Sequence, residues 1–116
     1  MKIFGVSQSS GVERQLKIER GIEAVVLTLT DHIGGKEQGR IFVRGDEFAA
    51  ALMEPAFGGS TIKGIIQAQS ERMLLGIDVR RNEVLLVIRS ESEEVGDVAV
   101  GLDDLQDALE GVINPG

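Results

Sequence analysis

Hydrophobic and polar residues alternate along several short stretches of the chain. In residues 14–20, "RQLKIER", Leu16 and Ile18 fall on one face and polar residues on the other, as in a half-buried strand. Other runs rich in β-branched and aliphatic residues predict strands at 24–31, 39–44, 83–90 and 96–101. Two further short runs predict one strand at 2–7, ahead of the runs in the first half of the chain, and one at 62–67, ahead of the runs in the second half.

The hydrophobic period changes from two to about 3.6 at two places, which predicts two short helices. One stripe contains Phe48, Ala51 and Leu52, and the other contains Leu105, Ala108, Leu109 and Val112. Asp46 and Asp103 fall in the first turns, where a carboxylate complements the helix dipole and can cap free N–H groups. Pro55 is expected to end the first helix.

The order of these elements repeats along the chain. Residues 2–32 align with 61–91 without a gap, and Gly39 placed on Gly96 starts a second ungapped match. We interpret this as one domain, 1–116, made of a ββββα unit used twice, at 1–55 and 61–113. The predicted fold class is α+β, with two antiparallel sheets and two short helices that cover each other as a pseudo-dimer within one chain.

Composition narrows the functional classes. The 116 residues include no cysteine and no stretch resembling a signal peptide or membrane span, so a cytoplasmic protein without membrane contact is expected. The net charge is −7, and residues 91–110 contain eight acids and no base. With four Phe and no Tyr or Trp, both charge and aromatic content weigh against nucleic-acid binding.

No catalytic or cofactor motif is recognisable. His32 stands apart from any residues spaced as metal ligands, and Ser9, Ser10 and Ser60 have no nearby base. Asp103 and Asp104 are adjacent and point to different faces of a helix, so they cannot form a catalytic dyad. We therefore expect a protein that is not an enzyme and that uses neither a metal nor a cofactor.

The run "RQLKIERGIEAVVLTLTDH" at 14–32 and the junction "IFVRGDEFAAAL" at 41–52 resemble the strands and the strand–turn–helix of a known family. That family is the single-stranded-DNA-binding transcriptional coactivators of the positive-cofactor-four type, to which the Whirly proteins are related. The resemblance implies binding of single strands by basic and aromatic residues around the second and third strands. In the first half those positions hold Gly21, Ile22, Ala24 and Thr30, whereas the second half has Arg80, Arg81, Glu83 and Arg89.

The resemblance therefore implies a binding surface around three arginines, Arg80, Arg81 and Arg89. Four further basic residues could extend it: Lys17, Arg20, Arg40 and Arg44. The three arginines are also explained as solvated charges at a turn and a strand edge. Two functions remain open. Either the chain binds single-stranded DNA or RNA through this surface, or it is an interaction or regulatory module that contacts a protein, with its acidic face as a candidate contact surface.

Overall fold

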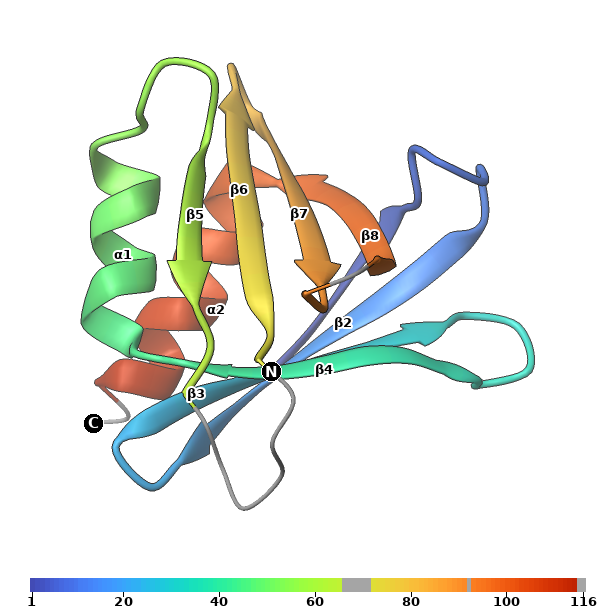
Figure 1. Ribbon diagram of the computed structural model, residues 1–116, viewed down its shortest axis with the longest axis horizontal. Coiled ribbons are helices and arrows are strands. Elements are labelled where there is room, and N and C mark those ends of the chain that lie inside the picture. The colour runs from blue at the N-terminus through green and yellow to red at the C-terminus, as the bar shows by residue number, and fades with distance from the viewer. Residues whose placement is uncertain (66–71, 92, 115–116) are drawn as a thin grey trace.

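The eight strands in the described part of the chain belong to a single antiparallel sheet. The computed structural model describes residues 1–65, 72–91 and 93–114 (Figure 1). The first four strands are β1 (Lys2–Val6), β2 (Glu13–Gly21), β3 (Ala24–Asp31) and β4 (Glu37–Val43), followed by helix α1 (Gly45–Met53). The next four are β5 (Ser60–Lys63), β6 (Leu74–Arg80), β7 (Glu83–Arg89) and β8 (Glu94–Gly101), followed by helix α2 (Leu102–Ile113). Their order across the sheet is β4-β3-β2-β1-β8-β7-β6-β5.

The prediction of two antiparallel sheets, packed as duplicated ββββα units in a pseudo-dimer, is wrong. The structure is instead a near-barrel of eight antiparallel strands with two helices, and strands make up 51% of it. The reason lies at the two central strands, where Val6 of β1 pairs with Ala99 of β8. The two halves of the chain join edge to edge at this pair, and their eight strands therefore belong to one sheet.

The sheet curves until its outer strands approach each other. Just beyond β5, the backbone N–H of Ile65 donates to the carbonyl of Phe42 in β4 at 2.7 Å. The enclosed side chains form one apolar core, to which every strand except β1 contributes a buried hydrophobic residue. Phe48 of α1 and Leu105 of α2 are fully buried in that core, so the helices lie on the inner side of the sheet.

Two glycines allow strands to approach closely inside the near-barrel. A Cβ on Gly39 would lie 3.1 Å from Val95 Cγ1, and a Cβ on Gly96 would lie 3.0 Å from the Gln38 carbonyl oxygen. The start of β4 therefore packs directly against the start of β8. The two glycines that the sequence comparison aligned with each other lie at this contact.

Most element boundaries follow the local patterns. Strands β1, β2, β3, β4, β7 and β8 confirm six of the seven predicted runs within two residues, and both helices lie where the period changes. Residues 62 and 63 of the predicted run 62–67 lie in β5, and residues 66 and 67 lie outside the described part of the chain. The capping prediction holds only partly, because neither N-cap residue makes a side-chain cap bond, although Asp46 Oδ1 accepts the Glu47 N–H at 2.9 Å.

Candidate nucleic-acid interface

The seven basic residues predicted from sequence do not form one surface. Arg80 ends β6 and Arg81 follows in the turn, whereas Arg89 lies at the far end of β7. Six residues along a strand correspond to roughly 20 Å, so Arg89 is remote from the other two. Arg80 also donates from Nε to Asp78 Oδ2 at 2.8 Å, which partly neutralises it. These three arginines therefore occupy two separate places on the second half of the sheet.

Arg20 and Arg44 lie near another end of the sheet. Arg20 lines a hollow between the β2–β3 turn and the start of α1, which also contains Asp46. Arg44 precedes α1, and its Nε lies 3.5 Å from Asp46 Oδ1. Both arginines are thus placed beside an acidic residue rather than beside Lys17 or Arg40.

Lys17 and Arg40 do come together, on the outer face of β1–β4. Thr28 pairs with Lys17 on one side and with Arg40 on the other, and Lys2 pairs with Lys17. Paired residues share a face, so Lys2, Lys17, Thr28 and Arg40 form one line across four strands, which we call the basic row. At about 4.8 Å per strand the basic row spans about 14 Å.

Two exposed ion pairs accompany the basic row. Lys17 Nζ lies 3.5 Å from Glu19 Oε1, and Arg40 Nη2 lies 3.1 Å from Glu37 Oε1. All four side chains are about half exposed, and exposed pairs of this kind contribute about 0–1 kcal/mol. A phosphate group could therefore replace either carboxylate at little cost. Arg40 Nε additionally donates to Thr28 Oγ1 at 3.3 Å, which holds the guanidinium against the sheet.

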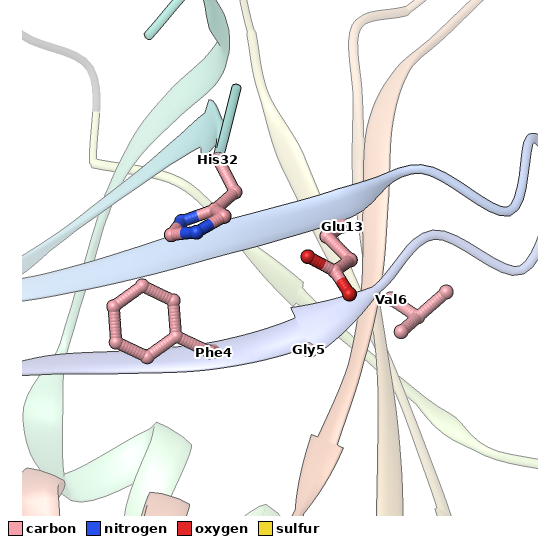
Figure 2. A pocket seen from close by; sticks show the side chains of 5 residues that line it. All are labelled: Phe4, Gly5, Val6, Glu13 and His32. Carbon is pink, nitrogen blue, oxygen red and sulfur yellow. The ribbon is translucent and has the colours of Figure 1, made fainter.

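An aromatic pair lies next to the basic row. Phe4 lies two residues after Lys2 in β1 and contacts His32 edge to face, with ring centroids 5.3 Å apart (Figure 2). Phe4 is 60% exposed, and with Val6 and Glu13 the two rings line a hollow of about 420 Å³. His32 also lines a second hollow, of about 390 Å³, which contains all four residues of the basic row. The two hollows thus form one polar and aromatic surface joined at His32.

The outer face of β5–β8 has a different chemistry. Its central positions are Leu85, Val87 and Ala99, all half-buried, together with Gly76. The hollow there, of about 210 Å³, includes one basic residue, Arg89, and one acid, Asp78. This apolar face offers few groups that could contact a phosphate backbone, although the family resemblance implied a binding surface on this half of the chain.

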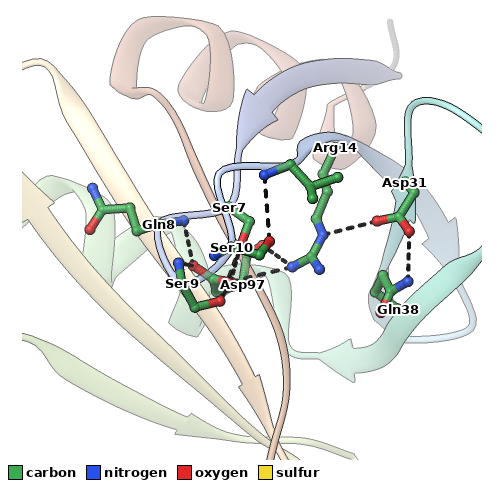
Figure 3. A network of polar contacts seen from close by, with 9 residues as sticks. Ser7, Gln8, Ser9, Ser10, Arg14, Asp31, Gln38 and Asp97 are labelled. Carbon is green, nitrogen blue, oxygen red and sulfur yellow. Dashed lines mark hydrogen bonds and ion pairs between the residues drawn. The ribbon is translucent and has the colours of Figure 1, made fainter.

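A buried polar network fixes β1 beside β8 (Figure 3). Both oxygens of Asp97 accept hydrogen bonds from the turn after β1. Ser7 and Ser9 hydroxyls donate to Oδ1 at 2.6 and 2.7 Å, and the Gln8 N–H donates to Oδ2 at 2.8 Å. Burial raises the pKa of Asp97, but the hydrogen bonds from Ser7, Ser9 and the backbone of Gln8 outweigh it and hold the pKa below its ordinary value.

Arg14 extends this network across the sheet. Its Nη1 donates to the Asp97 carbonyl at 2.8 Å and lies 3.3 Å from Asp97 Oδ1. Its Nε donates to Asp31 Oδ1 at 3.2 Å, and Gln38 donates to the other oxygen of Asp31 at 2.8 Å. Arg14 is buried, so its charge is used for cohesion and not for a ligand.

Sequence reasoning named Lys17 and Arg40 but missed Lys2, Phe4 and a role for His32. Membership of the basic row depends on strand register, which the sequence does not specify. One signal was available: Lys17 lies on the polar phase of an alternating strand, and Thr28 and Arg40 lie on strands expected to follow it.

No protein-family model and no curated protein matches this chain. The similarity to single-stranded-DNA-binding coactivators thus stays a prediction from the residues quoted above. Within the described residues, no group of three or more His, Cys, Asp or Glu could hold a metal ion. None of the described helices is both long and apolar enough to cross a membrane.

Proposed function

We propose that the protein binds single-stranded nucleic acid on the outer face of β1–β4. The observation that carries the proposal is the basic row, in which three cations lie on one line across four strands. Lysine and arginine side chains supply phosphate contacts, and exposed rings supply faces on which bases stack. Phe4 and His32 place such rings directly beside the cations.

The distribution of charge keeps the acids of the helices away from this face, where the three cations of the basic row lie beside Glu19, Asp31 and Glu37. The helices, which lie on the inner side of the sheet, contain six acids and no base: Asp46, Glu47, Asp103, Asp104, Asp107 and Glu110. Much of the net charge of −7 is therefore separated from the basic row. Local potential, and not net charge, decides where a polyanion approaches a protein.

The test is fluorescence anisotropy with a labelled oligo-dT of about 20 nucleotides, a length that spans more than one binding surface of this size. We compare the wild type with Lys17→Ala/Arg40→Ala, and use Arg80→Ala/Arg81→Ala as the control with the same loss of charge. Lys17 and Arg40 are both about half exposed, so their replacement by alanine is expected to preserve folding. Phe4→Ala separately tests base stacking, which contributes about 1–3 kcal/mol per base.

We expect the Lys17/Arg40 variant to bind at least about tenfold more weakly, because each lost phosphate contact removes a charge-dependent term. The slope of log K against log salt should also fall in magnitude by about 1.4, because each contact to a single strand contributes about 0.7. The control should stay within about twofold of the wild type. Equal weakening by both variants, or no binding at low salt, would contradict the proposal.

A further inference from the structure

The two helices leave a groove between them that the nucleic-acid proposal does not use. It has a volume of about 580 Å³ and lies between one side of α1 and one side of α2. Buried Leu52 and Leu109 form its floor, and its apolar walls are Ala49, Met53 and Ile113. Met53 is 76% exposed and lies beside the other apolar groups of the groove, which together present an apolar patch to solvent.

The rim of this groove is acidic. Asp46, Asp107 and Glu110 line it, and no lysine or arginine does. Arg44 forms an exposed pair with Asp46, but Asp107 and Glu110 make no ion pair with any residue that the structure describes. Glu110 also lies in the last turn of α2, where the helix dipole disfavours a negative charge. A cation at this position would relieve that repulsion.

We propose that the groove binds a basic amphipathic helix of another protein. The apolar side chains of such a helix, spaced at i, i+3/i+4 and i+7, would contact the floor and Met53. Its lysines or arginines would then lie beside Asp107 and Glu110. Helix α1 has nine residues and is therefore about 14 Å long, enough to support two to three turns of a partner.

The charges argue against a second copy of this chain as the occupant. A two-fold interface places the same patch on both subunits, so the acidic rim with Asp107 and Glu110 would face the acidic rim of the second copy. Like charges brought together across an interface oppose association. The complementary partner is cationic on its polar side.

The test uses a fluorescein-labelled Leu/Lys peptide of about 14 residues, with leucines on one helical face and lysines on the other. The variant Asp107→Lys/Glu110→Lys reverses the charge of the rim. Glu93→Lys/Glu94→Lys is the matched control, because it changes the net charge equally at exposed positions of the β7–β8 hairpin. Met53→Glu tests the apolar wall, and Ile33→Glu, at a position 85% exposed in the β3–β4 loop, is its control.

We expect the rim variant and Met53→Glu each to weaken peptide binding at least about tenfold, with both controls within about twofold of the wild type. Equal weakening by the rim variant and its charge control would show attraction to net charge alone and overturn the proposal. Absence of peptide binding would also overturn it. So would a wild-type dimer that Met53→Glu dissociates in sedimentation, because a second copy would then cover the groove.

Discussion

The β2–β3 junction and the β1–β8 junction hold neighbouring strands together by different means. Strands β2 and β3 pair over eight residue pairs, from Arg14 with Asp31 to Gly21 with Ala24. Strands β1 and β8 pair at Val6 with Ala99 alone. The first junction is made by the backbone, and the second depends on the side chains of Ser7, Arg14 and Asp97.

This difference shows that a few residues specify the β1–β8 junction, which joins the two halves of the chain into one sheet. A backbone ladder tolerates most substitutions because N–H and C=O groups are common to all residues. A junction made by side chains is sensitive to each of them. The position of Lys2 beside Lys17, by contrast, is set by the five residue pairs between β1 and β2.

The largest effect is expected from Asp97→Ala. The substitution leaves buried Arg14 without one of its two carboxylates and leaves Ser7 without its acceptor. Removing one partner of a buried pair costs about 3–5 kcal/mol, so we expect a loss of about 4 kcal/mol in the free energy of unfolding, measured in urea. Asp78→Ala is the control, because Asp78 pairs with an exposed arginine and should cost below about 1 kcal/mol. Similar losses in both variants would contradict a special role for the β1–β8 junction.

Gly5→Ala should have the next largest effect. A Cβ at Gly5 would overlap the carbonyl oxygen of Ala99 and lie 2.8 Å from Val100 Cγ1, so β1 would have to move away from β8. We expect a loss of about 3 kcal/mol, at the upper end for overpacking, measured by urea unfolding.

The control is Gly76→Ala, within β6. A Cβ there has 3.6 Å to the nearest atom, on Val87, so it should be accommodated. Replacing a strand glycine without a clash lowers the entropy of the unfolded chain, and the variant should stay within about 1 kcal/mol of the wild type. A Gly5 variant as stable as this control would show that the β1–β8 contact is not tight.

The elements of the fold could be predicted because their signals are local. Alternation around Leu16 and Ile18 identifies β2, and the stripe from Leu105 to Val112 identifies α2. The pairing of β1 with β8 could not be predicted, because residues about ninety positions apart meet there with no local pattern that marks them. The same alternation of hydrophobic and polar residues is compatible with two arrangements. One is a single sheet that continues from β1 to β8, and the other is two separate sheets.

The candidate site divides in the same way. Lys17 and Arg40 could be named from residue type and strand phase, whereas their alignment with Lys2 needed the register of four strands. Arg14 carried a signal that was missed: it shares the phase of Leu16 and Ile18, which places its charge on the core face of β2. The structure shows Arg14 buried on that face and paired with Asp97 and Asp31, whereas Arg20, in the same phase at the end of β2, is exposed.

The smallest effect should come from acid pH, because protonating Asp97 leaves its side chain in place. Its pKa is lowered in the folded protein, so the folded state binds this proton less readily than the unfolded state. The stability contributed by Asp97 is then fully present above its unfolded pKa, at about pH 4, and is lost as the pH falls through the folded value.

The measurement compares urea unfolding of the wild type and Asp97→Asn over a pH series. Asparagine keeps the size of the side chain and cannot titrate in this range. We expect the difference in free energy of unfolding to be constant above about pH 4 and to shrink below it. A difference that stays constant to the lowest pH would mean that the charge of Asp97 does not stabilise the β1–β8 junction. The pKa of Asp97 would then be the same in the folded and unfolded states, and its hydrogen bonds with Ser7 and Ser9 would favour the charged and the neutral carboxyl equally.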